Sequence, residues 1–241
     1  NIDKMKFPTL WEKYQCDSLA EKYFTKRTAF MQELMCDTEN IGEKWFKSIR
    51  VQGPDEIEDH DFIKTILCVD PASTTNRRSD YSAFGVASEA DNSFIYIRKG
   101  IIEKLSFNEY CNKVIELLRQ YEDITHVSIE KNTYQGADVL KIKELMLKDN
   151  ELANRNIEFI NEMQKKNKDD KISSIVDDVN FGRIIFNEDD KEFIGQIKEF
   201  AGQAYSLHDD APDVISECVH KLKTIENVTK VKILDKKLFG F

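Results

Sequence analysis

Carboxylate side chains gather in the stretch HDDAPDVISECVH, residues 208–220. Asp209, Asp210 and Asp213 lie close together there, at the start of an apolar helical pattern, and Asp210, Asp213 and Glu217 share one helix face at spacing i, i+3, i+7. Asp residues often cap a helix and favour its positive N-terminal dipole, which explains one such residue better than three. Neighbouring carboxylates are also what hard divalent cations bind. Both interpretations stay open, and one carboxylate can serve both roles.

Two more acidic residues end predicted strands. Asp70 ends the apolar run Thr65–Asp70 before Pro71, and Glu130 ends the short run His126–Glu130. Taken alone, each residue reads equally well as an ordinary strand end facing solvent. In a sheet with parallel central strands, however, strand ends lie side by side, and helices abut that edge. Together with the last helix, these residues predict oxygen ligands for two Mg²⁺ or Mn²⁺ ions, the arrangement that phosphodiester hydrolysis uses.

The elements that must position these residues predict an α/β fold. Three apolar strands follow one another at Thr65–Asp70, Tyr81–Ala90 and Phe94–Leu105, which favours an antiparallel meander. Helices and short strands then alternate, which favours parallel pairing and helices on both faces of the sheet. These later elements are a helix opened by the capping box Ser106/Glu109, a strand at His126–Glu130, a helix at Ala137–Lys148, strands near Asn156 and Gly182, a helix at Lys191–Phe200, and a last helix with the buried stripe Ile215, Cys218, Val219 and Leu222.

Composition narrows the class of protein. The chain has 241 residues, of which 41% are hydrophobic and 33% charged, which suits one medium-sized globular domain. A net charge of −9 does not exclude a nucleic-acid partner, because cations held by carboxylates can meet phosphates. The five cysteines are scattered without a CxxC pair, so we expect no disulfide framework, no zinc site and a reducing compartment. No apolar run approaches the roughly 18 residues of a membrane span.

The first part of the chain reads differently from the rest. Ser18 and Glu21 form a capping box that opens an amphipathic helix, and the acidic, turn-rich stretch Gly53–Asp61 is typical of a linker. We therefore expect a boundary near residue 55, with residues 1–55 and 56–241 in separate units. Because the chain begins with Asn1 rather than Met, we also expect a fragment or a processed piece.

Four segments in order resemble the C-terminal nuclease domain of the large terminase subunit of tailed bacteriophages. They are VDPASTTNRRSDYSAFGV (Val69–Val86), IEKNTYQGADV (Ile129–Val139), GRIIF (Gly182–Phe186) and HDDAPDVI (His208–Ile215). The resemblance covers roughly residues 63–222 and implies a ribonuclease H-like mixed sheet. FMQELMCDTE (Phe30–Glu39) is similar to the end of the terminase ATPase domain, with Glu33 at a position where that family usually has Glu. An ATPase domain would then lie upstream; since this chain has no GxxxxGK[ST] phosphate loop, we do not expect it to hydrolyse ATP by itself.

The resemblance also implies roles for individual residues. Asp70 would be the first metal-binding acid, Glu130 the second, and either Asp213 or Asp210 the third. Residues that would support the metals without binding them are Asp80, Asp209 and His208. Basic residues of two charged, irregular stretches are candidates for contact with DNA phosphates, although a solvated surface explains the second stretch equally well: Arg77, Arg78, Lys165, Lys166 and Lys171.

The resemblance implies a metal-dependent endonuclease that cuts double-stranded phage DNA during genome packaging in the host cytoplasm. Its expected partners are DNA and, in the full-length protein, the small terminase subunit and the capsid portal, without any membrane. Two alternatives stay open. One is another ribonuclease H-like nuclease, such as a junction resolvase or a transposase. The other is a module that docks the packaging motor on DNA or on the portal without cutting.

Overall fold

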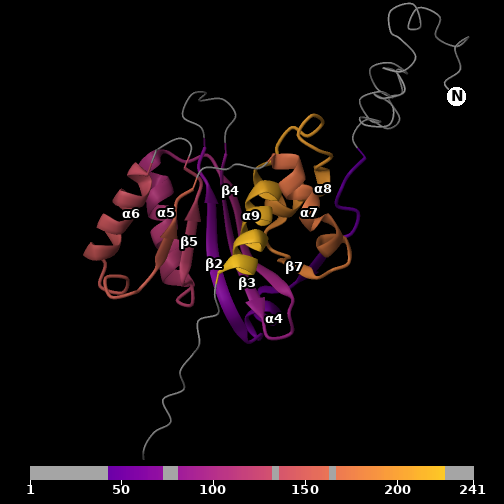
Figure 1. The fold of residues 1–241 in the computed structure, drawn as a ribbon. Coiled ribbons are helices and arrows are strands. Elements are labelled where there is room, and N and C mark those ends of the chain that lie inside the picture. Colours follow the sequence, from indigo (N-terminus) through magenta and orange to yellow (C-terminus); the bar gives the residue numbers. More distant parts are fainter. Residues whose placement is uncertain (1–42, 73–80, 132–135, 163–166, 226–241) are drawn as a thin grey trace, which may run out of the picture.

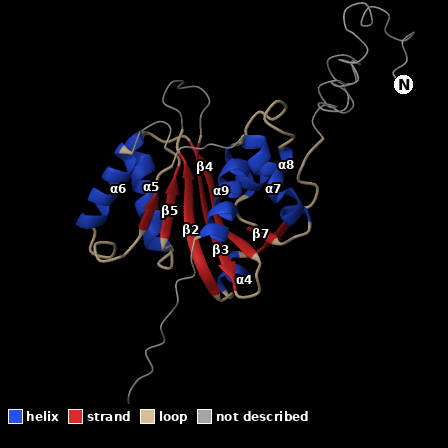
Figure 2. Ribbon diagram, in the orientation of Figure 1, coloured by secondary structure: helices blue, strands red, loops and turns tan. Residues whose placement is uncertain are grey.

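The computed structural model describes residues 43–72, 81–131, 136–162 and 167–225, and its centre is a seven-stranded mixed sheet (Figures 1 and 2). The strand order is β1-β7-β4-β3-β2-β5-β6. Strands β2, β3 and β4 form an antiparallel meander, and all other neighbours pair in parallel, as the sequence predicts. The strands are β1 (Arg50–Gln52), β2 (Phe62–Asp70), β3 (Ser82–Ala90), β4 (Ile95–Glu103), β5 (His126–Ile129), β6 (Glu158–Ile160) and β7 (Ile184–Asn187).

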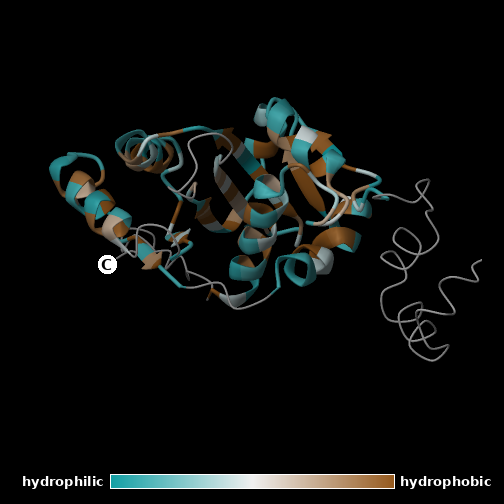
Figure 3. Cartoon of the chain, turned by 90° about the horizontal axis from the view of Figure 1, so that it is seen from above, coloured by the Kyte–Doolittle hydropathy of each residue, from teal (hydrophilic) through white to brown (hydrophobic). Residues whose placement is uncertain are grey.

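Helices cover both faces of the sheet, which the sequence also predicts (Figure 1). One face carries α5 (Phe107–Gln120) and α6 (Ala137–Lys148), and the other carries α7 (Lys168–Asn180), α8 (Lys191–Glu199) and α9 (Asp210–Thr224). Since side chains alternate along a strand, the apolar run of β2 feeds two cores. Ile66 and Cys68 pack toward α7, α8 and α9, whereas Leu67 and Val69 pack toward α5 and α6. Viewed from above, the hydrophobic colour follows the strands and the hydrophilic colour the outer turns of the helices (Figure 3).

The stretch expected to be a linker belongs to the same structure. Pro54–Glu58 forms the short helix α4, and Ile57 is buried against Tyr96 and Ile185 at one end of the sheet. Strand β1, just before it, pairs in parallel with β7. The expectation of a linker over Gly53–Asp61 is therefore wrong. The helix expected from Ser18, the position of Glu33 and the upstream domain lie outside the described residues.

Helix α7 differs from the sequence-based expectation, which places its lysines in a charged, irregular loop. Its buried residues Ile172, Ile175 and Val179 follow i, i+3, i+7 and pack into the core under α7, α8 and α9. Pairs of charged residues on either side conceal this stripe in the sequence. The difference matters for function, since α7 carries Lys168 and Lys171 to the carboxylates described below.

Two glycines let helices approach the sheet closely. A Cβ atom at Gly100 of β4 would lie 2.3 Å from a ring atom of Phe193 in α8, and a Cβ atom at Gly85 of β3 would lie 3.0 Å from the Sγ atom of Cys218 in α9. The Cys218 thiol also donates a hydrogen bond to the Gly85 carbonyl at 3.4 Å. Gly85 thus sets how near α9 lies to the strands. Among the described residues, no helix is both long enough and apolar enough to cross a membrane.

Gly100→Ala is expected to lower the free energy of unfolding by about 1–3 kcal/mol, because the new methyl group overlaps a buried phenylalanine ring. Gly195→Ala is the matched control: Gly195 also lies in this region, on α8, but a Cβ atom there meets nothing within 4 Å. That change should stabilise the protein by about 0.5–1 kcal/mol through helix propensity. Urea denaturation of both variants measures the difference. Equal stabilities would contradict the close approach of α8.

Candidate metal centre

The strand ends bring two acidic residues together. Strands β2 and β5 run parallel, with Val69 opposite Ile129, and the Glu130 amide donates a hydrogen bond to the Val69 carbonyl at 3.3 Å. Asp70 is the last residue of β2, two positions after Cys68, so its side chain lies on the face that α9 covers. Glu130 directly follows β5 at the same edge. Both acids therefore lie where parallel strands end and a helix begins.

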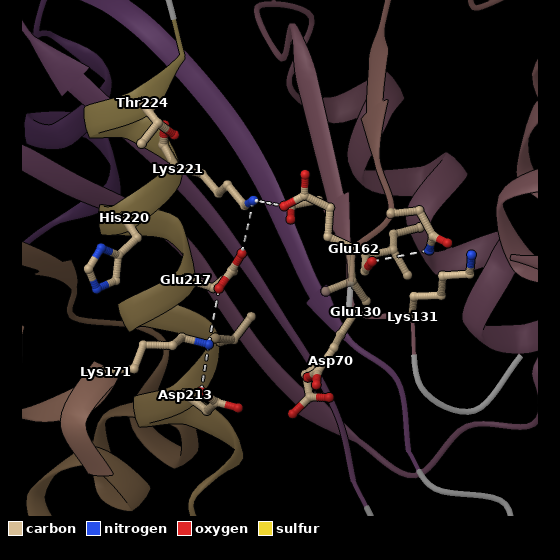
Figure 4. Close-up of a pocket in the computed structure, with 15 residues that line it drawn as sticks. Asp70, Glu130, Lys131, Glu162, Lys171, Asp213, Glu217, His220, Lys221 and Thr224 are labelled. Atoms are coloured by element: carbon tan, nitrogen blue, oxygen red, sulfur yellow. Dashed lines mark hydrogen bonds and ion pairs between the residues drawn. The ribbon is translucent and has the colours of Figure 1, made fainter. Parts of the chain in front are cut away.

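The third acid comes from the first turns of α9. Asp213 is only 1% exposed, and its carboxylate lies beside those of the two strand ends (Figure 4). One oxygen atom from each of Asp70, Glu130 and Asp213 lies within 4.8 Å of the other two. Three carboxylates from distant parts of the chain form an all-oxygen set, which is the kind of site that Mg²⁺ and Mn²⁺ prefer. The residues present therefore fit the divalent ions that the sequence predicts.

Burial and the neighbouring carboxylates both affect the pKa of Asp70. Burial raises the pKa of Asp70 well above its usual range, and the neighbouring charges of Asp213, Glu130 and Asp210 raise it further. The ammonium group of Lys168 lowers it again in part. Ionised Asp70 is thus disfavoured in the folded chain unless a positive charge comes close, which is the condition that a bound cation relieves.

Two lysines of α7 supply positive charge at Asp213. The Lys171 ammonium lies 2.7 Å from one Asp213 oxygen and 3.1 Å from Glu217, and the Lys168 ammonium lies 3.3 Å from the other Asp213 oxygen and 3.2 Å from Asp209. Burial alone would lower the pKa of Lys171, but Asp213 and Glu217 raise it above its usual value. Both lysines are therefore held charged.

The placement of Lys171 corrects the sequence analysis. It is expected there in a loop that touches DNA, yet its side chain is 6% exposed and faces two carboxylates inside the fold. The i, i+3, i+7 stripe of α7 is the signal that could have placed it, because Lys171 lies four residues before Ile175 and therefore on the same side of the helix.

The other described residues predicted for the site, His208, Asp209 and Asp210, lie at or just before the start of α9. Asp210 accepts a hydrogen bond from Gln196 at 3.4 Å, and burial followed by the charge of Asp209 raises the pKa of Asp210. Asp209 accepts hydrogen bonds from Lys168 and Gln203. The His208 ring stacks edge-on against Tyr81, 5.3 Å between centroids. Of the two candidates for the third acid, the structure brings Asp213 to Asp70 and Glu130.

A cleft of about 590 Å³ extends from the three acids along α9 (Figure 4). No motif in the sequence marks the far end of this cleft, where Lys221 and Glu162 form an ion pair of 2.9 Å. The charged and polar residues that line the cleft are Asp70, Ser128, Glu130, Lys131, Asn161, Glu162, Lys171, Asp213, Glu217, His220, Lys221 and Thr224. The remaining predicted site residues, Asp80, Arg77, Arg78, Lys165 and Lys166, lie outside the described residues.

Comparisons with known proteins place the fold. No family model matches the sequence, and no curated protein matches it either. Among solved structures, the human cytomegalovirus terminase nuclease domain is similar, with a TM-score of 0.52 and 12% identity over 81% of this chain and 93% of that one. A manganese-soaked form of that domain gives a TM-score of 0.50 with 13% identity over 73% of this chain and 90% of its own.

The large terminase of a thermophilic bacteriophage is similar as well. Its TM-score is 0.50 with 13% identity, and the match covers 69% of this chain and 43% of the phage chain, so this chain spans less than half of that large terminase. At sequence identities this low, these comparisons show a shared fold and nothing further. The chain has the ribonuclease H-like fold of terminase nuclease domains, and the predicted fold class is confirmed.

Asp70→Asn is expected to make the metal-free protein more stable at neutral pH. Because the folded chain raises the pKa of Asp70, this group contributes stability below its unfolded pKa of about 3.9, and the contribution is lost as pH rises through the folded pKa. The advantage of Asp70→Asn over the parent chain should therefore widen as pH rises from about 4. Thermal melting in EDTA measures it.

Asp177→Asn, at an exposed site on α7, is the control and should follow the parent chain at each pH. Mn²⁺ should raise the melting temperature of the parent chain more than that of Asp70→Asn. A constant difference between Asp70→Asn and the parent chain across pH would contradict the crowding of the three acids.

Lys171→Met is expected to lower the free energy of unfolding in EDTA by up to about 3 kcal/mol, because it leaves Asp213 buried with one counter-charge fewer. Mn²⁺ should recover part of the loss by supplying charge at the same carboxylates. Lys44→Met, which removes an exposed ion pair with Glu199, should cost less than about 1 kcal/mol. Similar losses in the two variants would show that the α7 lysine does not compensate the acids.

Proposed function

We propose that the chain is the nuclease part of a large terminase subunit and cuts double-stranded phage DNA during genome packaging. The observation that carries the proposal is the convergence of Asp70, Glu130 and Asp213 within 4.8 Å at one edge of a sheet with the terminase nuclease fold. Because a fold alone does not determine the chemistry, the proposal depends on the three acids. Their oxygen-only character suits metal-assisted phosphodiester hydrolysis, for which Mg²⁺ or Mn²⁺ would be the cofactor.

The acids and the two α7 lysines would have different roles in this reaction. Asp70, Glu130 and Asp213 would hold two divalent ions, and bound ions would supply a nucleophile at neutral pH and neutralise charge on the leaving oxygen. Lys168 and Lys171 hold the Asp213 carboxylate between them, so that it faces the strand ends. Asp210 is the alternative third ligand.

The partners follow from the resemblance to terminases. Double-stranded DNA is the substrate, and the small terminase subunit and the capsid portal are the partners of the full-length protein, in the host cytoplasm. The cleft beside the acids supports the DNA part of this proposal, since it leads solvent and ligands to the three carboxylates.

Cleavage of supercoiled plasmid tests the function. In Mn²⁺ or Mg²⁺ the parent chain should nick and linearise the plasmid, and EDTA should abolish both. Asp70→Asn and Asp213→Asn should each slow cleavage by roughly 100-fold or more, because each removes a metal ligand. Asp177→Asn should cleave at the parental rate. Asp210→Asn separates the two candidates for the third acid: if it abolishes cleavage while Asp213→Asn does not, Asp210 is the ligand.

The alternatives give other outcomes. A junction resolvase would cut a four-way junction in preference to linear duplex of the same sequence. A docking module would bind duplex DNA in Mn²⁺ and leave it intact after long incubation. Either result would overturn the proposal.

A further inference from the structure

We propose that Lys221 binds a backbone phosphate of the DNA strand that occupies the cleft, and that Glu162 holds the Lys221 ammonium until the phosphate replaces it. This inference rests on the proposed nuclease function and deepens it, since it assigns a substrate contact within the cleft. Nothing in the resemblance or in the sequence pattern marks either residue. The assignment comes from the way the cleft continues past the three acids.

The cleft places Lys221 at a useful distance from the reaction centre. Asp213, Glu217 and Lys221 follow one another at i, i+4, i+8 on α9, so one face of the helix runs from the metal end of the cleft to its far end (Figure 4). Eight residues of helix span about 12 Å. One strand of B-DNA presents a phosphate about every 3.4 Å along its axis. A strand whose scissile phosphate lies at the acids would therefore carry another phosphate past Lys221.

Burial distinguishes the two lysines that reach the cleft from helices, Lys171 on α7 and Lys221 on α9. Lys171 is 6% exposed, and its two short ion pairs join it to Asp213 and Glu217 inside the fold. Releasing it would leave a buried carboxylate with less compensation, at a cost of several kcal/mol. Lys221 is 18% exposed, and its partner at 2.9 Å is Glu162, which is 72% exposed. Exposed ion pairs are worth about 0–1 kcal/mol, so a phosphate can take the place of Glu162.

The surrounding charges favour such an exchange. Glu217 lies 3.7 Å from the Lys221 ammonium and on the same helix face, so it keeps the lysine directed along the cleft when Glu162 is displaced. Glu162 also fixes the backbone at this end, since its carbonyl accepts a hydrogen bond from the Lys131 amide at 3.0 Å. Its carboxylate, by contrast, lies on the exposed side of the cleft. The ion pair between Lys221 and Glu162 is therefore a displaceable contact between α9 and the segment that follows β6.

Fluorescence anisotropy with a labelled duplex tests the assignment. Binding is measured with the whole 241-residue chain in Ca²⁺, which occupies oxygen sites without the need for turnover, over a series of salt concentrations. Lys221→Gln should weaken binding three- to tenfold and reduce the salt slope by about one phosphate contact. Glu162→Gln should tighten binding about two- to fivefold. In the double variant the gain from Glu162→Gln should largely disappear, because that gain acts through Lys221.

Lys223→Gln is the matched control. Lys223 lies on the same helix, is 58% exposed and pairs with Asp178 on α7, away from the cleft. It should alter binding less than twofold, and melting curves verify that all variants fold. Parental affinity and salt slope in Lys221→Gln, or an undiminished gain from Glu162→Gln in the double variant, would overturn the assignment. If the parent chain cleaves plasmid but Lys221→Gln, Glu162→Gln and Lys223→Gln all bind DNA with parental affinity, only the assignment of Lys221 fails. If the parent chain neither binds DNA nor cleaves it, the proposed function fails as well.

Discussion

The packing of α9 against the meander is the constraint on which the candidate site depends. Asp213 reaches the strand ends only because α9 lies close to β3, where Gly85 leaves room for Cys218. The buried residues of α9 hold the helix against the sheet despite the repulsion among the acids: Val214, Ile215, Cys218, Val219 and Leu222.

Local patterns were sufficient to predict most of the sheet and to place Asp70 and Glu130 at the ends of strands. β2 is buried on both faces and reads as an unbroken apolar run, so its end at Asp70 could be placed from the sequence. Helix α6 has the predicted bounds, and the predicted capping box of α5 is present, with Ser106 and Glu109 hydrogen-bonded to each other. The choice between Asp213 and Asp210 was out of reach. Both lie on the same helix face, and which of them approaches Asp70 and Glu130 depends on the docking of α9, a long-range property.

The elements that were missed depend on partners far away in the sequence. β1 has three residues and forms through its pairing with β7, about 135 positions later, so no local pattern marks it. Helix α7 does have an apolar stripe at helical spacing, but the partners of its lysines are carboxylates of α9. A lysine that faces two carboxylates and one that faces solvent look alike in a sequence. Only the packing of α7 on α9 distinguishes Lys171 from a surface residue.

The two α7 lysines compensate the charge of a candidate metal ligand within the protein itself. Many small metal-binding domains fold only with the metal, because the free energy of metal binding supplies the free energy of folding. Here Lys168 and Lys171 place two positive charges against Asp213, and hydrophobic residues pack on both faces of the sheet. An ammonium group can stabilise a carboxylate, but it is a poor substitute for a divalent ion in generating a nucleophile at neutral pH. Under the proposed function, the lysines would therefore stabilise the carboxylates, whereas a bound divalent ion would supply the chemistry.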